Sequence, residues 1–168
     1  MARPTDKPTP TATYKPATAE GPAENVPLPV MPELAKEESA EGFAGFRRVL
    51  VQLINYGFEN RDSAPVREIS APDCERCNIF YMDLRKAYVN DDWIQGGEIN
   101  FNSAGTQFVK TPEERYQLLP SIRQDEVANR GPDGEVYFEA PNDDENSAQI
   151  MKATYSSGRW VVNLGENM

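Results

Sequence analysis

The only two cysteines of the chain, Cys74 and Cys77, stand three positions apart in the stretch SAPDCERC. Two thiols at this spacing suit three kinds of chemistry: a redox-active pair, half of a metal site, or a structural disulfide. Ser70, Pro72 and Asp73 form a helix-start pattern ahead of them, with Ser70 as the capping residue. Both cysteines are therefore expected in the first turn of a helix, where side chains at positions i and i+3 share a face.

The rest of the composition separates these three interpretations. Structural zinc needs four ligands, usually Cys or His, and this chain has no histidine and no further cysteine. We therefore expect no metal, and no cofactor motif is present. A thiol oxidoreductase normally places its Cys-x-x-Cys after a strand, whereas this pair follows a short predicted helix. The carboxylates of Asp73 and Glu75 would also raise a thiol pKa, which disfavours a reactive thiolate.

A short-loop disulfide between Cys74 and Cys77 is therefore the favoured interpretation, with the thiol oxidoreductase as an alternative. A bond that closes so small a loop stabilises a fold by only ~1–2 kcal/mol. Its role would be to fix the start of a helix. Because such bonds persist in oxidising compartments, the pair predicts an extracytoplasmic protein, either secreted or at the cell surface.

A second group of side chains has the types that an isomerase or dehydratase would need. Enzymes of the steroid isomerase type use a carboxylate base and a tyrosine that donates to an oxyanion. The candidates are Tyr81, Asp83, Tyr88 and Tyr116. Nothing in their spacing makes them converge, and the absence of histidine excludes the usual triads. We assign no catalytic residue and expect a non-catalytic role, with this enzyme class as an alternative.

The elements that would position these residues can be read from hydrophobic periodicity. Steps of three and four predict a helix over 33–60, with Arg47 and Arg48 largely on its polar face. A short helix is expected over 66–69 and a third over 73–90. The apolar positions of the first helix are Phe43, Phe46, Leu50, Leu53, Ile54 and Phe58.

After residue 90 the period falls to two, which is typical of strands. Trp93 to Gly97 is expected to form a bend, and Pro120 predicts an edge or bulged strand. Strands are expected at 98–102, around 116–127, at 136–138, and as a hairpin of 148–155 with 160–164. The acidic stretch 142–146 is expected to be a solvated loop, since it lacks the ligand spacing of a calcium site.

Three helices followed by four or five antiparallel strands define an α+β fold, with the helices packed on one face of a curved sheet. Such a cone has an apolar mouth, which is a common ligand pocket. We expect it to bind a small apolar ligand, or its surface to bind an envelope partner. Six aromatic residues are candidates for the pocket lining, although their spacing also suits plain core. They are Phe43, Phe46, Tyr81, Tyr88, Trp93 and Trp160.

Residues 1–24 differ in composition from the rest of the chain. They contain five Pro, five Thr and five Ala, with no apolar period, and therefore predict a disordered tether. Residues 25–168 are expected to form a single α+β domain. The tether's charges cancel, so the domain carries the whole net charge of −10. This charge argues against nucleic acid and against anionic lipid surfaces, and a monomer is expected.

The stretches SAPDCERC and DDWIQGGEI, together with Phe58, resemble a family of actinobacterial cell-envelope lipoproteins of unknown function. Members share a Thr/Pro-rich tether, a proline-paced lead into a long helix (here Pro27 to Pro32), and the Ser70 to Cys77 and Trp93 to Gly97 motifs. The resemblance covers roughly residues 25–165. It implies a cone fold like that of nuclear transport factor 2 and an exported lipoprotein. Membrane attachment would then come only through an upstream lipid anchor absent from this chain. The family offers no activity to carry over.

Overall fold

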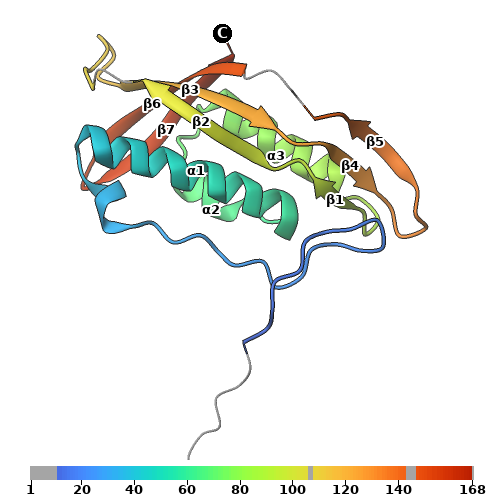
Figure 1. Ribbon diagram of the computed structural model, residues 1–168. Helices are drawn as coiled ribbons and strands as arrows, with labels where there is room; N and C mark the ends of the chain where they lie inside the picture. The colour runs from blue at the N-terminus through green and yellow to red at the C-terminus, as the bar shows by residue number, and fades with distance from the viewer. Residues whose placement is uncertain (1–10, 106–107, 143–146, 168) are drawn as a thin grey trace, which may run out of the picture.

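The computed structural model describes residues 11–105, 108–142 and 147–167. In this part of the chain the fold is α+β, with three α-helices and two antiparallel sheets (Figure 1). The helical elements are η1 (Glu33–Lys36), α1 (Ala40–Asn60), α2 (Ala64–Glu68) and α3 (Glu75–Ala87). The strands are β1 (Trp93–Gly96), β2 (Ile99–Gly105), β3 (Tyr116–Gln124), β4 (Val127–Arg130), β5 (Val136–Ala140), β6 (Ser147–Ser156) and β7 (Arg159–Asn167).

The long first helix begins later than the sequence predicts. Residues 33–36 form the separate 3₁₀ turn η1, and the chain is extended at Glu37 before α1 starts. Ser39 caps α1, because its hydroxyl oxygen accepts a hydrogen bond from the Gly42 amide at 2.9 Å. A Ser at this position satisfies one of the amides that a helix leaves unpaired at its start. The acidic residues near 33–38 therefore mark η1 and its exit rather than α1.

The curved sheet predicted from the sequence is built as two sheets joined by a kink. One sheet has the order β1-β4-β5 and the other β2-β3-β6-β7. The kink falls at Gly96 and Gly97, which both have positive φ (71° and 75°). A Cβ on Gly96 would lie 2.2 Å from the Glu126 carbonyl oxygen, so this crossing requires glycine. The predicted bend over Trp93 to Gly97 is thus a short strand followed by the kink.

Pro120 lies in β3, which is an interior strand, so the edge-strand alternative is wrong. The alternative of an irregular strand has support, because the ladder of β3 with β2 shifts register between Phe101 and Ser103. The proline is tolerated because the ladder between β3 and β6 is interrupted beside it. Leu118 pairs with Met151, and the next pair is Ser121 with Ala148. A proline has no backbone N–H to donate to a ladder. Because the ladder is broken at this point, no donor is required there. The hairpin predicted near the C-terminus is confirmed, with Ser157 and Gly158 at its turn.

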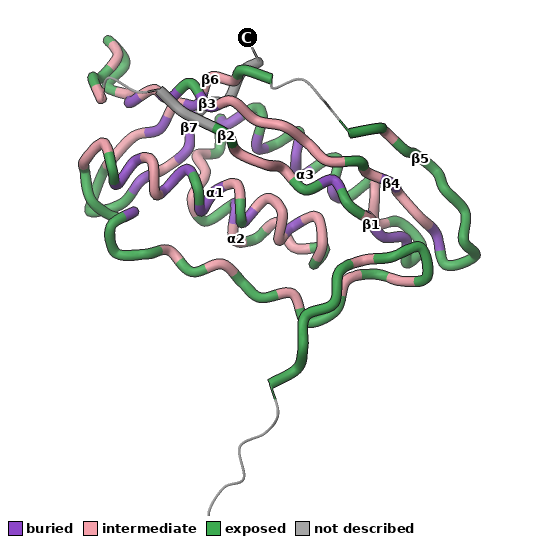
Figure 2. Tube along the Cα trace, in the orientation of Figure 1, coloured by how far each residue is buried: buried purple, intermediate pink, exposed green. Residues whose placement is uncertain are grey.

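The helices lie against the inner side of the curved strands (Figure 1). Helix α1 contacts β1 and β2, and α3 contacts β7. Buried residues follow the inward side of α1 and α3 and the strands that face them (Figure 2). The result is a cone whose wide end is bounded by α3, β4 and β5. Within the described residues, no helix is long and apolar enough to cross a bilayer.

Part of the predicted tether has structure, which corrects the expectation of a fully disordered segment 1–24. Lys15 and Glu24 form an antiparallel bridge that closes a small hairpin. The Trp93 indole N–H donates to the Thr18 carbonyl oxygen at 2.9 Å, and the Tyr14 hydroxyl donates to Glu59. The hairpin from 14 to 24 therefore rests on β1 and the end of α1 (Figure 1). Composition missed this docking because it depends on contacts distant in sequence. Residues 1–10 of the tether, and 143–146 of the predicted solvated loop, lie outside the described residues.

Candidate functional site

An apolar cavity lies between α1, the start of α3 and the inner side of β2, β3, β6 and β7. Its volume is ≈ 120 Å³, close to that of engineered cavities that hold one benzene molecule. Most of its wall is aliphatic or aromatic, and the disulfide forms part of it. The lining residues are Arg47, Leu50, Val51, Ile54, Val66, Cys74, Arg76, Cys77, Phe80, Ile99, Pro120, Ile122, Gln149, Ile150, Met151 and Val162.

A larger outer cavity of ≈ 730 Å³ adjoins this inner one, toward the wide end of the cone. Its wall adds Phe58 from α1, Ile79, Asp83 and Lys86 from α3, and Phe138 from β5. The volume is in the range of small-molecule sites. The two cavities share the lining residues Ile54, Arg76, Phe80, Ile99, Ile122 and Gln149. We therefore treat them as one site, with a narrow inner end and a wide mouth.

The six aromatic residues expected to line the pocket are placed elsewhere. Phe43, Phe46 and Trp160 are at most 2% exposed and pack on one another, with Phe43 and Trp160 stacked at 4.6 Å between ring centroids. Tyr81 is buried, with the Arg67 guanidinium over its ring. None of the six lines either cavity of the cone. Periodicity identifies the inward face of an element but cannot distinguish core from cavity wall on that face.

The other two aromatic candidates hold loops at the far end of α1. The Trp93 ring is buried under the N-terminal hairpin through its bond to Thr18. The Tyr88 hydroxyl donates to the Phe58 carbonyl oxygen. Burial raises the pKa of Tyr88 to about 12, so this hydroxyl stays protonated at neutral pH. Both residues have structural roles that a single sequence cannot reveal.

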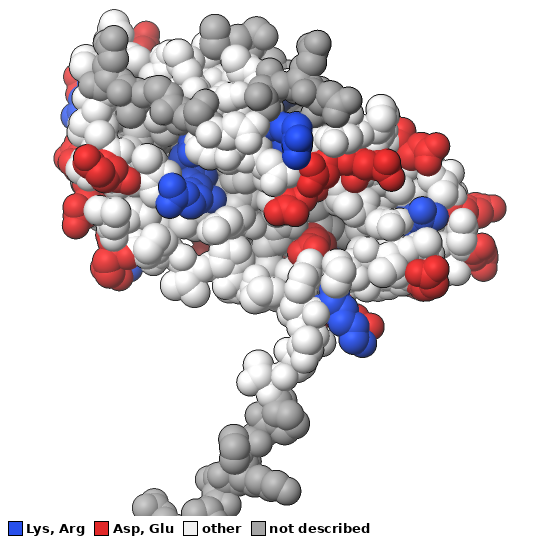
Figure 3. All heavy atoms as spheres, in the orientation of Figure 1, with Lys and Arg blue, Asp and Glu red and all other residues white. Residues whose placement is uncertain are grey.

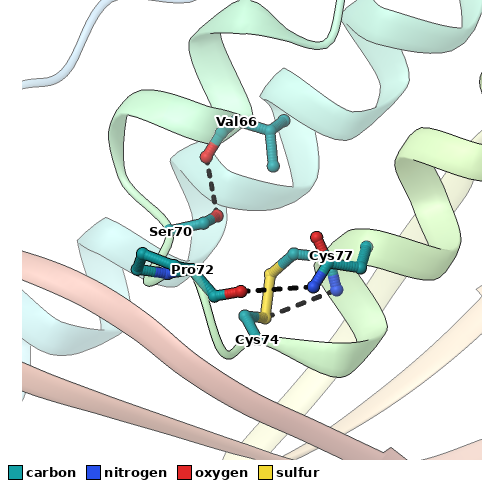
Figure 4. Close-up of a disulfide and its surroundings, with 6 residues drawn as sticks. Val66, Ser70, Pro72, Cys74 and Cys77 are labelled. Carbon is teal, nitrogen blue, oxygen red and sulfur yellow. Dashed lines mark hydrogen bonds between the residues drawn. A yellow bond between two sulfur atoms is a disulfide. The ribbon is translucent and has the colours of Figure 1, made fainter.

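Cys74 and Cys77 are joined by a disulfide at the start of α3 (Figure 4). Cys74 is the residue before the first turn, and its sulfur accepts from the Cys77 amide at 3.3 Å. Nearby, the Ser70 hydroxyl donates to the Val66 carbonyl oxygen at 2.6 Å. Ser70 therefore does not cap α3 as its pattern predicts; it closes the end of α2. Cys74 is fully buried and Cys77 is 8% exposed, whereas a reactive thiol needs solvent access.

The residues of the isomerase alternative do not converge. Tyr116 donates to Glu38 at 2.9 Å, near the narrow end of the cone. Tyr88 lies beyond the other end of α1, and Tyr81 is buried with no partner for its hydroxyl among the described residues. Asp83 is exposed at the mouth of the outer cavity. Among the described residues, no carboxylate faces a tyrosine inside the cavity, which is the pairing that this chemistry uses. Among the described residues no cluster could hold a metal ion.

Arg47 is the functional candidate that sequence reasoning missed. It was expected largely on the polar face of the first helix, but it is 3% exposed and lines the inner cavity. The signal was present, since Arg47 follows Phe43 by four positions and precedes Leu50 by three. That spacing puts it on the apolar face. Asn55 of the same helix donates to the Ile99 carbonyl oxygen and accepts from its amide.

Charge on the surface is unevenly distributed. On the face shown in Figure 3, acidic side chains lie across the centre and over the end formed by β4 and β5, with further ones at the opposite end, and basic side chains lie in small separate groups. The surface ion pairs are exposed, such as Lys15 with Glu24 at 3.1 Å. Pairs of this kind contribute little to stability. Arg47 differs from these pairs because its charge is buried and, among the described residues, has no ion-pair partner.

Comparison with known families gives one match over nearly the whole chain. Residues 12–165 match the model of a family of unknown function, DUF6318. The chain belongs to this DUF6318 family. The match begins at residue 12, inside the segment that forms the docked hairpin, so the DUF6318 region includes the contacts of Tyr14 and Thr18 with the domain.

Searches for individual relatives of this DUF6318 chain add little. No curated protein matches it. Among solved structures, it is similar to an uncharacterized protein with a cystatin-like fold from Caulobacter vibrioides. That likeness has 16% sequence identity and a TM-score of 0.43, and covers 77% of this chain and 89% of the other. At this level it carries no argument about function, so the function must be inferred from the site itself.

Proposed function

We propose that this protein is a non-catalytic binding domain whose cone holds a small apolar molecule. The observation that carries the proposal is the joined cavity, which runs from the mouth between α3 and β5 to the inner end beside α1. Its shared wall consists largely of Ile54, Phe80, Ile99 and Ile122. Apolar concave sites with few polar groups are the usual form of small-molecule pockets. Within the described part of the chain, the isomerase candidates Tyr81, Asp83, Tyr88 and Tyr116 do not converge, which favours this role over the isomerase alternative.

We further propose that the domain works outside the cytoplasm, attached through a lipid anchor upstream of the tether. The support is the buried disulfide, which persists in an oxidising compartment, and the resemblance of the sequence motifs to envelope lipoproteins. From the same resemblance we also propose that the cone is of the nuclear transport factor 2 type. Cell fractionation tests the location. Recovery from the cytosol with both thiols free would overturn it.

The binding proposal is tested by titrating the protein with N-phenyl-1-naphthylamine, a neutral probe that fluoresces in apolar surroundings. We expect saturable binding of one probe per chain. Ile122→Trp places an indole in the passage between the two cavities. It should lower the affinity for the probe by about tenfold or more, equal to roughly 1.4 kcal/mol of binding free energy. Leu119→Trp is the matched control, because Leu119 lies on the same strand but is 43% exposed and lines neither cavity.

The two tryptophan variants decide the proposal only if both fold, which their thermal unfolding transitions will show. Equal probe affinity in Ile122→Trp and Leu119→Trp would mean that the probe binds elsewhere. Absence of saturable binding to the wild-type protein would contradict the pocket altogether. Weak, unsaturable fluorescence in all three proteins would point to adsorption on exposed apolar side chains outside the cavities, such as Val30.

A further inference from the structure

The inner end of the cone contains a buried positive charge that the fold itself does not pair. Arg47 is 3% exposed, and among the described residues neither its Nε nor its Nη1 has a hydrogen-bond partner. Its guanidinium lies over the ring of Phe101 on β2, which offers a cation–π contact but accepts no N–H hydrogen bond in the plane of the guanidinium. A buried unpaired donor is unfavourable, and an unpaired buried charge more so.

The groups around Arg47 disfavour its positive charge. Burial lowers the pKa of Arg47 to about 9, and the neighbouring positive charge of Arg48 acts in the same direction. With that pKa the side chain is still protonated at neutral pH. Among the described residues, no carboxylate lines the inner cavity. Proteins normally pair a buried charge, and exceptions to this rule are typical of functional sites. At such a site a ligand can supply the missing partner.

The remaining cations of the cavity wall are of a different kind. Arg76 lines both cavities and Lys86 lines the outer one, but both side chains are solvent-exposed. Arg76 also interacts with another group of the protein. Asp83 stands beside Lys86 on the mouth of the outer cavity, so the mouth carries both signs of charge. Of the two arginines that line the inner cavity, only Arg47 is buried.

We propose that the cone takes an amphipathic monocarboxylate, with its carboxylate at Arg47 and its hydrocarbon chain along the cavity toward the mouth. This inference rests on the proposed function and assigns it a ligand class. A guanidinium is suited to a planar carboxylate because it can donate two parallel hydrogen bonds. The one buried positive charge matches one negative charge, and an inner volume of ≈ 120 Å³ admits a carboxylate with its first methylenes. The larger volume beyond accepts the rest of the chain.

The orientation follows from the same geometry. The shared wall of Ile54, Phe80, Ile99 and Ile122 would contact the hydrocarbon chain. If the carboxylate instead stayed at the mouth, the charge of Arg47 would remain unpaired and the inner wall would face only apolar atoms. Binding head-inward satisfies the guanidinium and covers the apolar wall at once. The ligand therefore completes a hydrogen-bonding set that the chain leaves open.

The test compares three ligands with the same twelve-carbon chain, each added below its micelle concentration and read by displacement of the naphthylamine probe. They are dodecanoate, 1-dodecanol and dodecyl phosphate. For the wild-type protein we expect dodecanoate to bind about 10- to 100-fold more tightly than 1-dodecanol, the gain typical of hydrogen bonds to a charged group. In Arg47→Met this preference should disappear, while 1-dodecanol keeps its affinity. Arg48→Met is the matched control and should keep the preference, because Arg48 is exposed.

A second readout distinguishes a ligand anchor from a structural residue. Replacing an unpaired buried charge with an apolar side chain of similar length is neutral or stabilising. We therefore expect the ligand-free Arg47→Met protein to melt at or above the wild-type temperature. A structural arginine would give a lower melting temperature. If Arg47→Met fails to fold, that result counts against the proposal, and the comparison of dodecanoate with 1-dodecanol on the wild type still stands as an independent test.

The outcomes separate this inference from the proposed function. If 1-dodecanol binds as tightly as dodecanoate to the wild type, the cone is an apolar pocket and the carboxylate assignment is wrong. Equal or tighter binding of dodecyl phosphate also overturns that assignment. If none of the three ligands displaces the probe, or the probe itself does not bind, the pocket proposal fails together with the inference.

Discussion

Replacing Trp160 by alanine is expected to lower the free energy of unfolding by about 3–5 kcal/mol, the usual loss for a buried aromatic side chain. Trp160 is 2% exposed and stands at the centre of the aromatic cluster. Its ring centroid lies 4.6 Å from that of Phe43, 5.2 Å from Tyr116 and 5.0 Å from Tyr155. The substitution therefore removes one partner from several ring contacts and leaves a cavity at the narrow end of the cone.

The indole also has a polar role, because its N–H donates to the Glu37 carbonyl oxygen at 3.0 Å. That bond connects β7 to the segment between η1 and α1. Trp160→Phe is the matched control, since it keeps an aromatic ring but loses the donor. We expect it to lose about 1–2 kcal/mol beyond the difference in buried area. Urea unfolding of the three proteins measures both values, and a loss under about 1 kcal/mol for Trp160→Ala would contradict this packing.

Gly42→Ala is expected to destabilise the protein by about 3 kcal/mol, the upper end of the range for overpacking. A Cβ on Gly42 would lie 2.1 Å from the Glu37 carbonyl oxygen and 2.9 Å from that of Leu34. Both contacts are to backbone, which cannot move as a flexible side chain can. The substitution should also disturb the bond between the Glu37 carbonyl and Trp160.

This prediction has a clear sign, because helix propensity alone favours the opposite result. In a helix interior alanine is more stable than glycine by about 1 kcal/mol. Gly45→Ala in the same helix is the matched control, since its nearest contact is the Ala35 Cβ at 3.3 Å. We expect its stability to stay within about 1 kcal/mol of wild type. If Gly42→Ala were as stable as Gly45→Ala, that result would contradict the close contact between α1 and the segment after η1.

The parts of the fold that the sequence predicts well are those set by local pattern. The apolar stripe of α1 and the C-terminal hairpin follow from residue spacing and turn residues alone. The order of helices and strands also predicts the α+β class. Boundaries are predicted less accurately: the third helix ends at Ala87 rather than near residue 90, and the bend predicted at 93–97 contains the short strand β1.

What the sequence could not predict depends on contacts between distant segments. Pro120 is tolerated in an interior strand because the β3–β6 ladder has a gap beside it, so no backbone N–H is needed at that position. This gap is visible only in the three-dimensional structure. The hairpin from 14 to 24 is held by Trp93 and Glu59. No local pattern in a Thr/Pro/Ala-rich stretch reports such partners.

The candidate site was predicted as an apolar cone but not in its details. The six expected lining residues have structural roles, and the true wall is mostly aliphatic. Periodicity places Phe43 and Leu50 inward, and it places Arg47 inward equally well. The polar character of arginine led to the opposite assignment. A charged residue on an apolar helix face is therefore a signal to retain, since it marks the inner end of the cavity here.

The central claim, that the cone admits an apolar molecule, is tested most directly by isoleucine-methyl NMR during titration with the naphthylamine probe. The chain has seven isoleucines. Ile54, Ile79, Ile94, Ile99, Ile122 and Ile150 line the cavities, and Ile69 does not. The account predicts saturable shifts for the lining methyls, largest for Ile54, Ile99 and Ile122, with Ile69 unchanged. Unmoved methyls at these three positions under saturating probe would contradict it.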